Sequence, residues 1–264
     1  MSSPAGPNPI TAAWSMLMAR RVRRPRPAPD NRLAPLDNSV LGRVLMDLRQ
    51  NGVAVLVDHR STLASYRDQL EAIDPDSLTR NGALAYWINL YNSGALDLAA
   101  EASTRSEATV LRVPGGFRRP WARVAGEELS LDAIEHGKIR RFNDPRIHGG
   151  LVCGSASCPT LRYEPFEAED LDEQLDDQMR TFLTGGGAVR DEIGGRLHLS
   201  RVFLWFGGDF TRPRSMPTLL PARRAAVADA LGTWLAPETE SWRLATGPTV
   251  TFQPYDWSLA CAIR

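Results

Sequence analysis

The sequence contains few cysteines and lacks a long apolar run. Only 3 of its 264 residues are cysteines, and this small, odd number favours a reducing cytoplasm over an oxidising exterior, where small scaffolds carry many paired cysteines. A run of about eighteen apolar residues is absent, so we expect no transmembrane helix. We recognise no export signal either, because arginines follow the mildly apolar segment 10–19. These features predict a cytoplasmic protein.

The chain also lacks an excess of either charge. Its 31 basic residues balance 31 acidic ones, so nothing global favours nucleic acid or an anionic membrane as a partner. Phosphate-binding glycine motifs, the zinc-protease motif H-E-x-x-H and the serine-esterase motif G-x-S-x-G are missing. We therefore expect no cofactor and no nucleic acid, and a small-molecule or peptide substrate of unidentified type if the protein is an enzyme.

Residues 1–36 are rich in proline and arginine. The prolines would interrupt any regular element, so this segment is predicted to be a flexible tail. A solvated tail is the favoured interpretation, and a weak contact with phosphate or an anionic membrane is the alternative. That contact would use the arginines of the tail, which are Arg20, Arg21, Arg23, Arg24 and Arg26.

Residues 37–264 are predicted to form a single globular domain. With 43% apolar residues in the whole chain, the sequence can build a substantial core. The segment Leu84–Leu96 is apolar on nearly all sides, which indicates a central buried helix. Short apolar runs at residues 53–57, 147–153 and 250–252 predict strands. The expected fold class is therefore α/β (α+β), with a central buried helix and a mixed sheet.

Two further helices are indicated in the middle of the chain. Ser130 is placed to cap a helix that begins at Leu131, and residues 164–182 have the apolar spacing of an amphipathic helix. The predicted core contains residues from several of these elements: Trp87, Ile88, Tyr91, Leu151, Val152, Phe203 and Trp257.

Six motifs occur in a fixed order along the chain. They are "NGVAVLVDHRSTLASY", "ALAYWINLYNSGAL", "LSLDAIEHGKIR", "DPRIHGGLVCGSASCP", "LSRVFLWFGGDF" and "YDWSL". In these motifs and their order the sequence resembles the domain of unknown function 547 family, over about residues 40–260. The resemblance implies a domain and no particular reaction. By analogy at the level of the fold alone, it also implies a likeness to papain-like and transglutaminase-like proteins.

The chain departs from the family pattern at two positions. Gly149 stands where the family usually has a bulky residue, and Ala260 stands where the motif "YDWSLN" ends in asparagine. If that asparagine orients a catalytic group, Ala260 weakens the case for activity.

Cys153 is the candidate nucleophile of a cysteine-dependent hydrolase or acyl-transfer enzyme. Such an enzyme needs a base next to the thiol and a third group that orients the base. His136 is the candidate base. On a helix after Ser130 it lies four residues beyond Asp132, so Asp132 could orient its imidazole, and Glu135 is the reserve for that orienting role.

Five further residues are candidates for binding. Ser155 and Cys158 belong to a loop of small residues whose amides could form an anion site. Asn89 and Asn92, three apart on the central helix, could donate to substrate, or could equally satisfy buried backbone groups. In an extended strand His148 would lie about 16 Å from Cys153 and on the opposite face, so it is a binding candidate and not a base.

Three other interpretations stay open. The same motifs could be core and turn chemistry in a non-catalytic scaffold or interaction domain, since free cysteines are often buried and inert. A metal site on Cys153, Cys158 and one or two histidines is disfavoured by the spacing of the cysteines, and we expect none. A redox pair is disfavoured because the two cysteines lack the C-x-x-C spacing. Whether they form a disulfide, and the oligomeric state, do not follow from the sequence.

Overall fold

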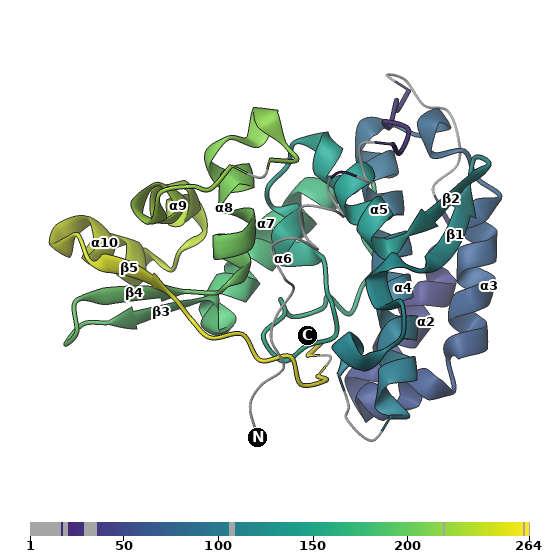
Figure 1. Cartoon of the computed structure of the whole chain (residues 1–264), viewed down its shortest axis with the longest axis horizontal. Coiled ribbons are helices and arrows are strands. Elements are labelled where there is room, and N and C mark those ends of the chain that lie inside the picture. Colours follow the sequence, from purple (N-terminus) through teal and green to yellow (C-terminus); the bar gives the residue numbers. More distant parts are fainter. Residues whose placement is uncertain are drawn as a thin grey trace.

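A computed structural model describes residues 17, 21–28, 36–105, 109–218, 220–260, 262 and 263. Helices dominate, and two small sheets accompany them (Figure 1). Arg20, Cys261 and most of the predicted tail lie outside the described residues. The mixed α/β fold class is confirmed.

The helices follow one another along most of the chain. The α-helices are α2 (Ser39–Asn51), α3 (Arg60–Glu71), α4 (Arg80–Ser103), α5 (Leu131–Gly137), α6 (Ile147–Gly150), α7 (Leu171–Phe182), α8 (Val202–Thr211), α9 (Arg224–Leu231) and α10 (Pro237–Thr246). Short 3-10 turns are η1 (Val53–Val57), η2 (Pro75–Ser77), η3 (Val110–Arg112), η4 (Gly116–Arg118), η5 (Ile139–Phe142), η7 (Pro213–Ser215) and η8 (Gly232–Trp234), and η6 (Leu183–Gly187) is a π-type turn.

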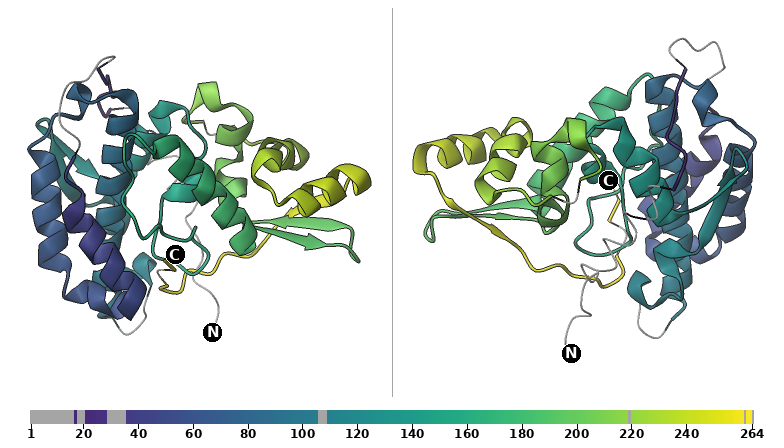
Figure 2. Two further views of the ribbon diagram at one scale, coloured as in Figure 1. Left: turned by 180° about the vertical axis from the view of Figure 1, so that it is seen from behind. Right: turned by 45° about the horizontal axis from the view of Figure 1, so that its top comes forward.

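The two sheets lie far apart in the molecule (Figures 1 and 2). The hairpin of β1 (Pro120–Val124) and β2 (Glu127–Ser130) is antiparallel and leads directly into α5. The second sheet has the order β3–β4–β5, with β3 (Ala188–Asp191) antiparallel to β4 (Arg196–Leu199) and β4 parallel to β5 (Thr249–Phe252). This second sheet has both parallel and antiparallel pairing and is the mixed sheet that was predicted.

Helix α4 is the centre of the larger part of the molecule. Its N-terminus is capped by Thr79, whose hydroxyl accepts the amide of Gly82. Nearly every residue from Gly82 to Ala102 is buried, as expected for a helix that is apolar on all sides. The predicted central helix is therefore confirmed, and all seven predicted core residues are buried.

The apolar core has two parts. The larger cluster joins α2, α3, α4, α5 and the hairpin β1–β2, and the smaller one joins α7, α8, α9 and the second sheet. In Figures 1 and 2 these parts lie at opposite ends of the long axis, with α6 and α7 between them. After β5 the chain runs back from the smaller part to the middle of the molecule. This return brings the C-terminal residues to the centre.

Two glycines inside helices provide a matched test of the packing. A Cβ atom at Gly94 would lie 2.5 Å from Leu131 Cδ2 and 2.6 Å from Trp121 Nε1, whereas one at Gly42 would lie 3.7 Å from Pro165 Cδ. We expect Gly94→Ala to lower the free energy of unfolding by about 1–3 kcal/mol and Gly42→Ala to raise it by up to about 1 kcal/mol. Urea unfolding of both variants measures this. Equal effects would contradict the packing of α4 against α5.

Two predicted strands are helical turns in the structure. Residues 53–57 form η1, a 3-10 connection between α2 and α3 that buries only Leu56. Residues 147–150 form α6, where the glycines permit close packing: a Cβ at Gly149 would lie 2.8 Å from Met179 Sδ. Both predictions were wrong because a short apolar run does not show whether a partner strand is present. The amphipathic helix α7 also begins at Leu171, later than predicted.

Residues 21–28 lie against the folded part of the chain. The amide of Arg23 donates to Glu127, and its guanidinium pairs with Asp76 at 2.7 Å. Val22 packs on the larger core, and the amide of Ala28 donates to Leu78 O. For these eight residues the structure shows a docked segment where the sequence predicted a flexible tail. The Arg23 guanidinium is engaged with Asp76, so an anionic contact would rely on Arg21, Arg24 and Arg26, which stay a prediction.

Candidate functional site

Two asparagines on α4 hold the backbone on either side of the segment 151–161, here called the cysteine loop. Asn92 Nδ2 donates to Gly150 O at 3.0 Å, and Asn92 Oδ1 accepts the amide of Val152 at 3.2 Å. Asn89 makes the same pair of bonds with the backbone of Phe166, at 2.8 and 2.9 Å. Because an unpaired buried backbone group costs about 1–3 kcal/mol, these side chains fix where the loop begins and where the following segment lies.

The returning C-terminal segment pairs with the cysteine loop. Ala156 N donates to Ser258 O at 2.9 Å, and Ala260 N donates to Gly154 O at 3.0 Å. Ala260, which replaces the family's usual asparagine, therefore contributes to this pairing through its backbone. The pairing places Tyr255 next to the cysteines.

Cys153 and Cys158 are joined by a disulfide, with their Cα atoms 6.3 Å apart. The turn between them uses Gly154 with a φ of 78°, a conformation in which glycine carries no steric cost. Both cysteines are partly exposed. The amide of Cys153 donates to Cys158 Sγ at 2.9 Å. The pairing that the sequence left open is thus present.

Two hydroxyl groups surround the disulfide. Tyr255 Oη lies 3.3 Å from Cys153 Sγ and 3.4 Å from Cys158 Sγ. Ser155 Oγ lies 3.0 Å from Cys153 Sγ and 3.5 Å from Cys158 Sγ, and it donates to Tyr255 Oη at 2.9 Å. A disulfide sulfur carries no proton and can only accept, so a hydrogen bond to either sulfur here is donated by a hydroxyl or by the backbone amide.

An aromatic wall holds the ring of Tyr255. Its centroid lies 4.8 Å from that of Trp205 on α8 and 4.5 Å from that of Trp257. Burial raises the pKa of Tyr255 to about 12, and the hydrogen bond from Ser155 opposes that rise. The phenol consequently keeps its proton throughout the physiological range and stays a donor.

Helix α5 carries His136 and the two carboxyl groups, Asp132 and Glu135, that the sequence offered to orient it. The predicted cap is confirmed, because Ser130 Oγ accepts the amide of Ala133. Glu135 is nearly buried, and Tyr91 donates to it at 3.3 Å. Burial raises the pKa of Glu135 to about 7, with Arg140 opposing the rise. Asp132 is partly exposed in the first turn of the same helix.

The imidazole of His136 faces a cation. Arg140 Nη1 donates to His136 Nδ1 at 3.2 Å, and Glu135 Oε1 lies 3.5 Å from the same nitrogen. Since an arginine can only donate, Nδ1 is the acceptor and the ring proton resides on Nε2. Burial, together with Arg140, holds the pKa of His136 well below its usual range. His136 is thus a neutral imidazole, which supplies no positive charge to a thiolate.

A fully buried ion pair lies beside His136. Arg140 donates from Nε and Nη2 to the two oxygens of Asp209 at 2.7 and 2.9 Å. His148 Nε2 lies 2.9 Å from Asp209 Oδ2, and its ring stacks on Phe206 at 4.2 Å. Burial alone would raise the pKa of Asp209, but the bonds from His148 and Arg140 outweigh it and hold that pKa well below its ordinary value.

The structure brings together only some of the predicted site residues. Cys153, Ser155 and Cys158 share one cluster around Tyr255, whereas His136 and His148 belong to the ionic cluster around Arg140 and Asp209. Among the described residues, no histidine is hydrogen-bonded to either sulfur. The Cys153–His136 pairing therefore remains a prediction that this geometry does not display.

Three residues of the site were not singled out from the sequence. Tyr255 lies in "YDWSL" and Asp209 in "FGGDF", so both stood in recognised motifs without an assigned role. Arg140 ends "LSLDAIEHGKIR". A charged residue at the end of an apolar run, as in "FLWFGGDF", was the signal available for Asp209, because such residues are buried only when paired.

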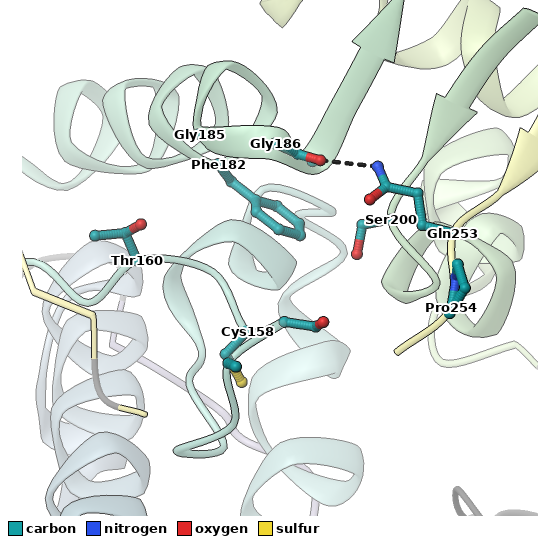
Figure 3. Close-up of a pocket in the computed structure, with 11 residues that line it drawn as sticks. Cys158, Thr160, Phe182, Gly185, Gly186, Ser200, Gln253 and Pro254 are labelled. Carbon is teal, nitrogen blue, oxygen red and sulfur yellow. Dashed lines mark hydrogen bonds between the residues drawn. The ribbon is translucent and has the colours of Figure 1, made fainter. Parts of the chain in front are cut away.

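A half-open pocket of about 190 Å³ adjoins the cysteine loop. Figure 3 shows Phe182, Ser200 and Gln253 around it, with Cys158 and Thr160 in the facing wall. Gln253 Nε2 donates to Gly186 O and closes one side. None of the described residues that line the pocket is charged. The pocket therefore suits a neutral, hydrogen-bonding group.

Residues 75–183 match the family described as "Protein of unknown function, DUF547". This match confirms, for residues 75–183, the resemblance inferred from the motifs. The matched segment contains α4, α5 and both disulfide cysteines, and it ends before Asp209 and Tyr255. No curated protein and no solved structure matches the chain.

Neither a metal site nor a membrane span is found in the part of the chain that the structure describes. It contains no group of three or more His, Cys, Asp or Glu side chains arranged to hold a metal ion. None of its helices combines the length and apolarity needed to cross a bilayer.

Proposed function

We propose that this protein carries out thiol–disulfide exchange at Cys153 and Cys158. The single observation that carries the proposal is the disulfide itself, partly exposed and contacted at both sulfurs by hydroxyl groups. If the protein is cytoplasmic, as the sequence predicts, this disulfide belongs to the transient, catalytic or redox-sensing kind, because stable disulfides are rare in that compartment.

The exchange needs a partner dithiol and no other reactant. A partner thiolate attacks Cys158 Sγ, a mixed disulfide forms, and the electron pair of the broken bond leaves with Cys153 Sγ. The second thiolate of the partner then attacks its own sulfur in the mixed disulfide and releases the Cys158 thiolate. The partner loses two electrons and becomes a disulfide, while Cys153 and Cys158 become thiols once protons are taken up from water.

The contacts favour Cys158 as the cysteine that meets the partner. Its sulfur accepts the Cys153 amide in addition to the hydroxyl groups, and a thiolate gains from each such donor. Cys158 also belongs to the wall of the neutral pocket, whereas Cys153 packs against the smaller apolar core. The uncharged lining suits the backbone of a peptide, so we propose a protein or peptide dithiol as substrate.

A cysteine-dependent hydrolase or acyl transferase is the second candidate. The observation in its favour is Glu135, whose raised pKa, near 7, suits a general acid–base group and whose charge acts on Tyr255 beside the cysteines. In this candidate the reduced Cys153 is the nucleophile and Glu135 or His136 is the base. The scaffold interpretation predicts neither activity.

Parallel assays of the full-length protein separate the three candidates. We expect the oxidised protein to oxidise a peptide dithiol with release of one peptide disulfide per protein disulfide, as measured by mass spectrometry. We expect the reduced protein to hydrolyse p-nitrophenyl acetate no faster than its Cys153→Ser variant does. Ester hydrolysis that is lost in both Cys153→Ser and Glu135→Gln would favour the second candidate, and inertness in both assays would favour a scaffold.

A further inference from the structure

We propose that Tyr255 is a catalytic residue of this exchange, whose hydroxyl donates a hydrogen bond to the thiolate released from either cysteine. The inference rests on the proposed thiol–disulfide exchange and adds the group that stabilises its leaving sulfur. Tyr255 lies outside the segment that matches the family.

The position of the hydroxyl suits both directions of the reaction. Tyr255 Oη is almost equidistant from the two sulfurs, at 3.3 and 3.4 Å. When the bond between the sulfurs opens, the negative charge appears on one of them, and the same O–H can turn to whichever sulfur carries it. A charge-assisted hydrogen bond is roughly twice as strong as a neutral one, so the contact strengthens as the thiolate forms.

Ser155 directs the proton of Tyr255 toward the sulfurs. Ser155 Oγ donates to Tyr255 Oη at 2.9 Å, so the phenol oxygen already receives a proton and its own O–H is free to point at sulfur. Hydrogen bonds in such a chain polarise one another. The chain Ser155 to Tyr255 to sulfur is therefore a better donor than an isolated phenol.

The surroundings keep the phenol protonated and fixed. Trp205 and Trp257 hold the ring, and Glu135 is the carboxyl group whose charge acts on Tyr255 from α5. Tyr91 on α4 is also within electrostatic range. Negative charge at Glu135 disfavours ionisation of the phenol, so Tyr255 donates a hydrogen bond and does not give up its proton.

The test compares Tyr255→Phe with the matched control Tyr163→Phe. Phenylalanine retains the ring that packs on Trp205 and Trp257. The ring of Tyr163 instead packs against the guanidinium of Arg49. In the reduced protein, thiolate absorbance near 240 nm is titrated against pH. We expect Tyr255→Phe to raise the lowest thiol pKa by about one unit and to slow opening of the disulfide by a peptide thiol roughly tenfold. Tyr163→Phe should change neither quantity.

The outcomes separate this inference from the proposed function. If Tyr255→Phe exchanges at the wild-type rate with an unchanged thiol pKa, the role of Tyr255 is overturned while the exchange stands. If the wild type does not exchange at all, the proposed function fails, and the thiol titration still decides whether Tyr255 stabilises a thiolate. Equal melting temperatures of the two variants guard against misfolding. Ser155→Ala should show the same direction of change as Tyr255→Phe, and an opposite direction would contradict the donor chain.

Discussion

Replacing Cys158 with serine is expected to reduce dithiol oxidation by at least about a hundredfold, because the reaction proceeds only through sulfur. Cys153→Ser is expected to trap an intermediate of the reaction. With Cys158 left free, it should form a mixed disulfide with an activated peptide disulfide, and this adduct should persist because the resolving thiol is missing. The measurement is the mass of the intact protein after incubation with peptide, followed over time.

Cys261→Ser is the control for these variants, because it also removes one thiol. It should leave the rate of dithiol oxidation unchanged. A persistent adduct on Cys158→Ser instead of Cys153→Ser would show that Cys153, the residue that the sequence named as the nucleophile of a hydrolase, meets the partner. Wild-type activity in Cys158→Ser would remove the disulfide from the reaction altogether.

Replacing Asp209 with alanine is expected to lower the free energy of unfolding by about 3–5 kcal/mol. Asp209 is fully buried and is the bidentate partner of Arg140 as well as the partner of His148. Its removal leaves a buried guanidinium without this counter-charge, and desolvation of that cation is no longer offset. Denaturant unfolding at neutral pH measures the effect.

Asp229→Ala is the matched control for Asp209→Ala. Asp229 also pairs with an arginine, Arg243, at 2.6 Å, but its side chain is 66% exposed. An exposed pair contributes about 0–1 kcal/mol, so this variant should unfold almost as the wild type does. Similar losses in the two variants would contradict the buried ionic cluster.

The acid side of the unfolding profile should depend on the same carboxyl group. The folded-state pKa of Asp209 is depressed, so its stabilising contribution is present above the ordinary pKa of an aspartate and is lost as the pH falls toward the folded-state value. In Asp209→Ala this part of the acid dependence should be missing. The measurement is the same denaturant series repeated at successively lower pH.

Much of the fold could be predicted from local sequence patterns. Helix α4 is apolar on all sides, and a helix of that kind has to be buried wherever the rest of the chain lies. The cap at Ser130 and the strand at residues 249–252 follow from equally local signals. These elements depend little on distant parts of the chain, so the patterns were sufficient.

For the segment 147–153 the local sequence pattern gave the wrong secondary structure. Its apolar residues suit a buried strand, but none of the strands in the described part of the chain pairs with it. The glycines instead allow α6 to pack closely against α7. Because residues 147–150 are helical, the strand geometry that placed His148 about 16 Å from Cys153 and on the opposite face does not apply. Alternation along a strand does not apply to a helical turn, and His148 is in fact directed to Asp209.

Only the part of the site whose residues are close in sequence was predicted. Cys153, Cys158 and Ser155 are close in sequence, so their proximity in space was expected. Tyr255 reaches them only because the chain after β5 returns and pairs with the cysteine loop, about a hundred residues away in sequence. No local pattern encodes that return, and the same holds for Asp209 and Arg140.

Thiol–disulfide exchange at Cys153 and Cys158 is tested most directly by measuring the redox state of these two cysteines at different ratios of reduced to oxidised thiol buffer. The full-length protein is equilibrated in mixtures of reduced and oxidised dithiothreitol, quenched in acid, alkylated under denaturing conditions and analysed by peptide mass spectrometry. We expect Cys153 and Cys158 to gain and lose label together, in one two-electron transition, while Cys261 stays labelled throughout. Independent labelling of Cys153 and Cys158 in every buffer would show that no exchangeable disulfide joins them and would contradict the proposed function.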